Sequence, residues 1–160
     1  MRILFDLQAL QTESRFRGIG RYAKSLIDSL VRTSGNHQMI FVISDLFPET
    51  VEPLKAYFEE LDAGELVLFS GVAGVRAMEI ETVPNRLVQE RIYSTFIADL
   101  KPDVLLILSP FEGYVDDAIR PVNLEGFWLV GLFMILYRLY RKIFILIQTR
   151  VTVIFIWIRY

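Results

Sequence analysis

Short apolar runs alternate with longer amphipathic stretches along the first 108 residues. Four runs have the length of a buried strand, at residues 3–5, 39–43, 65–69 and 104–108. Between them, apolar residues recur at helical spacing from Gly18 to Val31, from Pro48 to Leu61 and from Asn85 to Leu100. Strand and helix in alternation indicate right-handed crossovers. The pattern predicts an α/β fold with a parallel sheet of at least four strands and helices on both of its faces.

The same periodicity predicts which face of each helix is buried. The first helix should bury Tyr22, Ala23, Leu26, Ile27, Leu30 and Val31. The second should bury Val51, Leu54, Tyr57, Phe58 and Leu61. The third should bury Leu87, Ile92, Phe96, Ile97 and Leu100.

The pattern changes near Gly126. All 19 acidic residues lie at or before Glu125, whereas residues 127–160 hold five basic residues among aromatic and aliphatic ones. We therefore divide the chain into a domain at 1–126 and a hydrophobic, basic tail at 127–160, which we expect to be irregular. The tail exposes apolar surface and is an aggregation liability.

Composition excludes several classes of function. There is no cysteine and a single histidine, His37, expected at the surface. Disulfides and a thiolate or multi-histidine metal site are thus excluded, and we expect no metal. With its only histidine in a surface loop, the sequence offers no Ser-His-Asp set. The acidic body offers no footprint for nucleic acid. Asp6 follows the start too closely for a signal peptide, so we expect a cytoplasmic protein.

A glycine-containing loop precedes the first predicted helix. Gly18 and Gly20 stand at the helix start, where free N–H groups and the helix dipole suit a phosphate. Gly18 and Gly20 with Ala23 also have the spacing of a dinucleotide fingerprint, but Gly18 lies more than ten residues after the first strand. Arg15, Arg17 and Arg21 could attract an anionic substrate. The alternative is an ordinary helix start with a solvated basic face.

Glu112 follows the fourth predicted strand, at the sheet edge where open α/β sheets bind ligands. Its carboxylate could accept a hydrogen bond from a sugar hydroxyl. The alternative is a solvated loop carboxylate. No catalytic residue is assigned from the sequence.

Three segments resemble bacterial retaining glycosyltransferases of family 4 (group 1), which have the GT-B fold. They are residues 1–8, residues 12–22, and residues 96–104 with 109–113, and the resemblance covers about residues 1–118. It implies that residues 1–126 are an incomplete, acceptor-side Rossmann-like domain. The partner domain that holds the nucleotide sugar has no counterpart in this chain.

The resemblance also implies a function and a site. Family members transfer a sugar from a nucleotide sugar, such as GDP-mannose, to a surface-polysaccharide or lipid-linked acceptor, without a metal or other cofactor. By position, Gly18 would contact the diphosphate of the sugar donor. We add Gly20 and Arg21 as candidates for binding the donor phosphates or substrate, and Arg17 and Glu112 as candidates for binding the acceptor. We expect this chain to be inactive alone.

The family's next strand should end in His or Tyr, then Asp, Leu, an apolar residue and Pro. Suppose the reading frame is shifted so that each codon consists of the last base of one codon and the first two bases of the next. The codons of Phe133 and Met134 then encode only Tyr or His at their junction, and those of Met134 and Ile135 encode Asp. We therefore hypothesise a single-base frameshift between about Gly126 and Leu132, which would account for the acid-free tail.

Two other interpretations remain open. One is a small interaction protein that associates peripherally with the inner membrane through its tail, whose longest charge-free run, residues 127–137, is too short to span a bilayer. The other is a fragment of a dinucleotide-binding oxidoreductase, against which the distance of Gly18 from the first strand argues.

Overall fold

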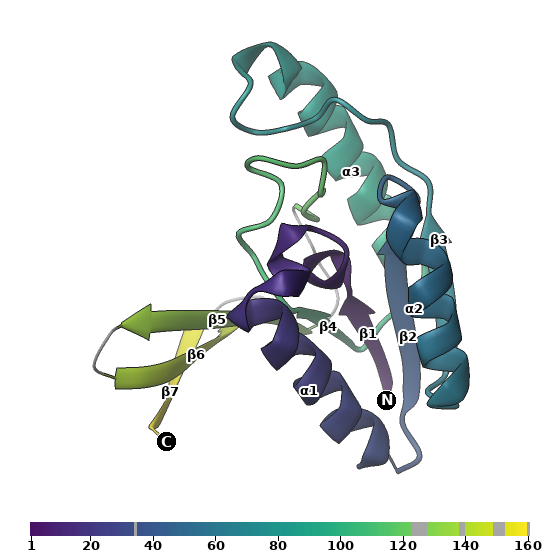
Figure 1. The fold of residues 1–160 in the computed structure, drawn as a ribbon, viewed down its shortest axis with the longest axis vertical. Coiled ribbons are helices and arrows are strands. Elements are labelled where there is room, and N and C mark those ends of the chain that lie inside the picture. The colour runs from purple at the N-terminus through teal and green to yellow at the C-terminus, as the bar shows by residue number, and fades with distance from the viewer. Residues whose placement is uncertain (34, 123–127, 138–139, 149–152, 160) are drawn as a thin grey trace.

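The computed structural model describes residues 1–33 and 35–122 in full, and the backbone alone of 128–137, 140–148 and 153–159. Four parallel strands form the centre: β1 (Arg2–Asp6), β2 (Gln38–Ser44), β3 (Glu65–Phe69) and β4 (Val104–Ile107). In the sheet they lie in the order β3-β2-β1-β4 (Figure 1). The predicted α/β, Rossmann-like parallel sheet is confirmed.

Three helices connect these strands: α1 (Gly18–Arg32), α2 (Pro48–Glu60) and α3 (Val83–Asp99). The short 3-10 helices η1 (Gln8–Leu10) and η2 (Glu13–Phe16) precede α1, and η3 (Ile80–Thr82) precedes α3. Strand residues alternate between two cores. Phe5 and Phe41 face α1 and α2, whereas Leu4 and Ile40 face α3.

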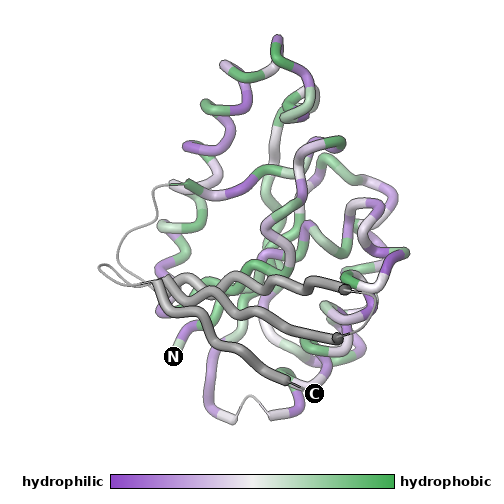
Figure 2. Tube along the Cα trace, turned by 90° about the vertical axis from the view of Figure 1, so that its left-hand side faces the viewer, coloured by the Kyte–Doolittle hydropathy of each residue, from purple (hydrophilic) through white to green (hydrophobic). Residues whose placement is uncertain are grey.

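Hydrophobic residues concentrate along the central strands, and hydrophilic stretches alternate with hydrophobic ones along the peripheral helices (Figure 2). On one face, Ala23 and Ile27 of α1 are fully buried, and the ring of Phe58 of α2 lies tilted against that of Phe41, with ring centroids 4.3 Å apart. The other face holds an aromatic cluster in which the ring centroids of Phe69 and Tyr93 lie 4.6 Å apart. The buried face predicted for α2 is confirmed, and that of α1 is confirmed except for Tyr22, which is half-buried and lies outside this core. The predicted side chains that pack in the core are Ala23, Leu26, Ile27, Leu30, Val31, Val51, Leu54, Tyr57, Phe58 and Leu61.

The face predicted for α3 is wrong in its amino-terminal half. Ile97 is buried as expected, but Leu87 is 55% exposed and Ile92 is 47% exposed. The buried positions of this half are polar: Arg86, Gln89 and Glu90, followed by Tyr93. They are buried because this half of α3 lies against loops at the sheet edge, whose backbone groups need polar partners.

The described parts of the tail are regular and not irregular as expected. Strand β5 (Trp128–Tyr137) pairs in parallel with β4, and β6 (Tyr140–Gln148) and β7 (Val153–Arg159) follow in antiparallel order. Isoleucine, valine and aromatic residues dominate these segments, and such residues favour extended backbone. Within the described residues, no helix is long and apolar enough to cross a membrane.

Candidate functional site at the carboxyl edge of the sheet

The carboxyl ends of β1 to β4 meet at one edge of the sheet, where residues 7–17, 45–47, 70–82 and 108–122 connect to the next elements. In Figure 1 the green loop that follows β4 lies between α3 and the purple turns η1 and η2. Ligands of open α/β sheets bind at this edge, so it is the candidate site.

Two glutamine side chains anchor the loop that follows β1. The Gln11 amide donates to the Ser44 carbonyl at 2.8 Å and accepts from the Ser44 N–H at 2.7 Å. The Gln8 amide pairs in the same way with the backbone of Ile119, with both distances 2.7 Å. Each side-chain amide makes the pair of hydrogen bonds that the backbone of a neighbouring strand would make. Together the two glutamines hold η1 and η2 against the end of β2 and against the loop after β4.

Asp6, the last residue of β1, is buried beneath this loop. Its carboxylate accepts from the Gln8 N–H at 3.0 Å and from the Gln8 side-chain amide at 3.2 Å. Burial raises the pKa of Asp6 to about 6, because desolvation of the charged form outweighs these hydrogen bonds. The buried Tyr93 hydroxyl makes no hydrogen bond of ordinary geometry. Burial raises the pKa of Tyr93, and the negative charge of the nearby Asp6 raises it further. Asp6 can therefore change its charge near neutral pH.

Glu112 is buried with 8% of its surface exposed, so the solvated alternative for this residue is wrong. Its Oε2 accepts a hydrogen bond from the Thr12 hydroxyl at 2.7 Å, and Thr12 in turn accepts from the Ser14 N–H. The charge of Glu112 contributes to the raised pKa of both Asp6 and Asp116, after the larger effect of burial. The carboxylate thus ties the loop after β4 to η2, and it is close enough to two other carboxyl groups to affect their protonation.

Arg86 of α3 holds two loops together. Its Nε donates to Glu90 at 2.8 Å, and its Nη1 donates to the carbonyls of Val75 at 2.9 Å and Gly113 at 2.7 Å. Gly113 has a φ of +86°, and a Cβ there would lie 2.2 Å from the carbonyl oxygen of Ala118. A side chain at position 113 would therefore distort the loop after β4, and its Cβ would also come within 2.8 Å of Arg86 Nη2.

Three buried polar atoms of this edge have no hydrogen-bond partner among the described residues: Arg86 Nη2, Tyr93 OH and Ser109 Oγ. Buried polar groups in native proteins are nearly always paired, directly or through water. Their concentration here indicates a region that is more polar than the rest of the core.

The predicted glycines differ in their surroundings. Gly18 begins α1, and no side chain caps that helix end. Gly20 is buried, and a Cβ there would come within 2.5 Å of the Arg15 Cα and the Ser14 carbonyl oxygen. Gly20 is required for the close packing of η2 on α1, a role that sequence reasoning missed.

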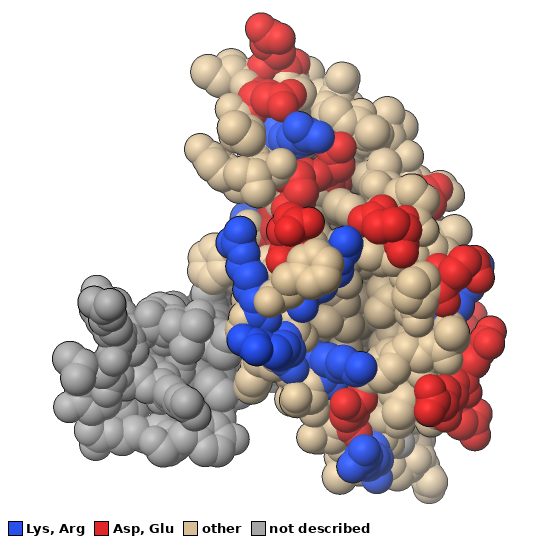
Figure 3. Space-filling view, viewed as in Figure 1, with Lys and Arg blue, Asp and Glu red and all other residues tan. Residues whose placement is uncertain are grey.

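The predicted arginines lie at the surface. Arg17 and Arg21 are exposed, and Arg15 forms an ion pair with Glu49 at 3.1 Å. Basic side chains gather over η2 and the start of α1, while acidic ones dominate over α2 (Figure 3). The structure places these basic residues and Gly18 on one surface, with Glu112 buried beneath the same loop.

Other features lie away from this edge or offer no ligand set. A pocket of about 490 Å³ lined by Lys55, Glu59, Asp62 and Gly64 lies at the opposite end of the sheet, where β3 begins. His37 is at the surface as expected. Within residues 1–33 and 35–122, no group of three His, Cys, Asp or Glu side chains could hold a metal ion.

The chain is similar to two curated proteins from Escherichia coli, both described as serotype-specific mannosyltransferase WbdA. The first is 30% identical over 118 residues, which are 72% of this chain and 14% of the relative. The second is 26% identical over 90 residues, 55% of this chain and 11% of the relative. The matched part of the chain thus spans about a seventh of the first relative and about a ninth of the second, and the matches relate it to glycosyltransferases. No protein-family model matches it. No solved structure matches it significantly.

Sequence reasoning missed Asp6, Gln8, Gln11 and Arg86 as parts of the site. The signal for the first three was available, since a polar run directly after a buried strand lies at the carboxyl edge. Arg86 carried no such signal, because a charged residue in an amphipathic helix is expected to face solvent.

Proposed function

We propose that residues 1–126 are the acceptor-side domain of a GT-B glycosyltransferase of family 4. In the complete enzyme, this domain would take part in moving a sugar from a nucleotide sugar, GDP-mannose being the candidate, to a surface-polysaccharide or lipid-linked acceptor. The match of 118 residues to a mannosyltransferase carries the proposal. The polar network at the carboxyl edge of a Rossmann-like sheet supports it, because that edge is where such folds bind ligands.

The proposed roles follow the loop that begins α1. Gly18 and Gly20, with Arg21, would contact the phosphates of the sugar donor, Gly18 through the free N–H groups of the helix start. Arg17 would contact the acceptor from the surface. Glu112 is buried and accepts a hydrogen bond from Thr12, so it holds the loop after β4 against η2. It would reach an acceptor hydroxyl only when this loop moves away from η2.

A chimera tests this function. The matched 118-residue segment of the E. coli relative is replaced by the corresponding residues of this chain, and mannosyl transfer from GDP-mannose to a glycan acceptor is measured. We expect transfer by the chimera, and its loss when Gly18 is replaced by Leu. A folded chimera without transfer would contradict the proposal. We expect no turnover by the 160-residue chain alone, because its match covers only 14% of the first relative.

We also propose that residues 127–160 are read in a shifted frame and that the chain is a fragment of such an enzyme. The confinement of all 19 acidic residues to the first 125 positions supports this. Sequencing the gene tests it: the shifted frame should encode His or Tyr followed by Asp at Phe133 and Met134 and continue without a stop codon. An early stop would end the hypothesis. The proposal places the reaction in the cytoplasm, with peripheral contact to the inner membrane through the tail.

A further inference from the structure

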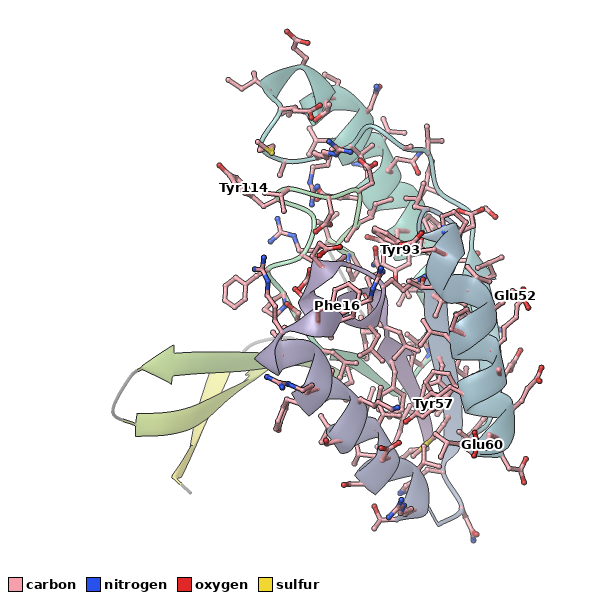
Figure 4. The ribbon with its side chains drawn as sticks, viewed as in Figure 1. Phe16, Glu52, Tyr57, Glu60, Tyr93 and Tyr114 are labelled. Carbon is pink, nitrogen blue, oxygen red and sulfur yellow. The ribbon has the colours of Figure 1, made fainter. Side chains whose placement is uncertain are left out.

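Phe16 is a large aromatic residue that the fold leaves at the surface. It is the last residue of η2 and is 68% exposed. The guanidinium carbon of Arg15 lies 4.6 Å from the centroid of its ring, within the range of a cation–π contact. Figure 4 shows Phe16 over the turn that precedes α1, at the carboxyl edge of the sheet.

The residues around Phe16 fix its position. Arg15 donates to the Gln11 carbonyl and to Glu49, and the Gln11 side chain is in turn held by Ser44. The close approach of Gly20 to the backbone of Ser14 and Arg15 fixes η2 against α1. These contacts fix the backbone that carries Phe16, and the Arg15 guanidinium covers one side of its ring, so less conformational entropy is lost when a ligand binds than on a free loop.

The charges around Phe16 are mainly positive. Arg15 lies against the ring, Arg17 follows Phe16 directly in the chain, and Arg21 lies in the first turns of α1; Arg17 and Arg21 are both exposed. Of the acidic side chains close in sequence or contact, Glu49 is paired with Arg15 and Glu13 is exposed. Figure 3 shows basic side chains on several sides of this turn. Arginine pairs with phosphate oxygens through two parallel N–H groups, and the surface is therefore complementary to an anionic, phosphate-bearing ligand.

We propose that Phe16 is a stacking platform for the sugar ring of a sugar phosphate, and that Arg17 and Arg21 bind its phosphate. An aromatic face accepts the apolar C–H face of a pyranose, and the flanking arginines select a charged substituent over a neutral sugar. This site rests on the proposed function for its ligand class. The same chemistry occurs in a nucleotide-linked sugar and in a phosphate-linked glycan acceptor.

Saturation-transfer NMR and calorimetry on the full chain test the proposal, with mannose 1-phosphate, mannose, inorganic phosphate and GDP as probes. We expect mannose 1-phosphate to bind, with the strongest saturation on its ring protons, and mannose and phosphate to bind more weakly. Phe16→Ala should weaken binding of mannose 1-phosphate by about twofold to tenfold, and Phe16→Trp should restore it. Ile80→Ala, which alters another exposed apolar side chain, should change nothing.

The charged part is tested separately. Arg17→Met with Arg21→Met should reduce the affinity for mannose 1-phosphate to that for mannose, whereas Arg91→Met, at an exposed position of α3, should not. Displacement of mannose 1-phosphate by GDP would assign both arginines to the nucleotide-linked sugar and so move Arg17 from the acceptor. Absence of displacement would assign both to the acceptor and so move Arg21 from the donor. Either result agrees with the proposal.

Two results would overturn it: equal binding by the wild type and Phe16→Ala, or binding of inorganic phosphate as tight as that of mannose 1-phosphate. The outcome is separable from that of the chimera. An active chimera with no binding of mannose 1-phosphate to the chain refutes only the Phe16 site, whereas binding with an inactive chimera refutes only the proposed function.

Discussion

Helices α1 and α3 cover opposite faces of the same sheet but are held by different forces. α1 packs through small and aliphatic side chains, with Ala23 and Ile27 fully buried and Gly20 in contact with the preceding turn. The amino-terminal half of α3 buries a charged pair, Arg86 and Glu90, while its aliphatic residues face solvent. The contrast shows that the loop network at the carboxyl edge, more than apolar packing, determines how that half of α3 is oriented.

The largest expected effect is at Arg86. Arg86→Met should lower the free energy of unfolding by about 3–5 kcal/mol, because the buried Glu90 loses its partner and two loop carbonyls lose their donor. Urea unfolding followed by circular dichroism measures it. Lys55→Met, which breaks the exposed ion pair with Glu52, should cost about 0–1 kcal/mol. Equal losses in the two variants would show that the Arg86 pair is no stronger than a surface one.

The next largest effect concerns pH and Asp6. Its pKa is about 6 in the folded chain and 3.8 ordinarily, so the folded state binds the proton more tightly. The resulting stability is fully present below pH about 4 and is lost as pH rises through 6, an effect of about 3 kcal/mol. Asp6→Asn removes this titration.

The difference in unfolding free energy between the wild type and Asp6→Asn should therefore shift in favour of the variant between pH 4 and pH 7. Urea titrations at several pH values measure it. Because both proteins share all other titrating groups, those groups cancel in the difference. A difference that does not vary with pH would mean that Asp6 is not desolvated.

A smaller effect tests the close contact of α1. Gly20→Ala should destabilise the chain by about 1–3 kcal/mol, since the added Cβ meets backbone atoms that cannot rotate away. Thermal unfolding measures the loss. Ser25→Ala, at an exposed position of the same helix, should stay within about 0.5 kcal/mol. If Gly20→Ala behaved like Ser25→Ala, the packing of η2 on α1 would be looser than described.

The smallest effect is predicted at Leu87, which periodicity places in the buried face of α3 and the structure places in solvent. Leu87→Ala should change the free energy of unfolding by no more than about 0.5 kcal/mol. Ile97→Val, a smaller truncation at a fully buried site, should cost about 0.5–1.5 kcal/mol. A larger loss at Leu87 than at Ile97 would restore the periodic interpretation.

Most of the fold could be predicted because local sequence decides it. The four strands are continuous apolar runs, and these are typical of strands buried on both faces. Helices α1 and α2 carry their apolar residues at helical spacing, which alone orients them on the sheet. The candidate site was predictable only in its loops, since Gly18 and Glu112 follow strands or begin a helix, whereas the partners of Gln8, Gln11 and Arg86 lie far away in sequence.

The sequence by itself determined the order of strands and helices, the edge of the sheet that carries the polar residues, and the change in composition near Gly126. Only the tertiary structure decided that Glu112 is buried, that Arg86 faces inward and that Gly20 has no room for a side chain. The spacing of apolar residues predicts which face of a helix or strand is buried. It does not record which backbone groups of distant loops need a hydrogen-bond partner, and those needs turned the polar side of α3 toward the core.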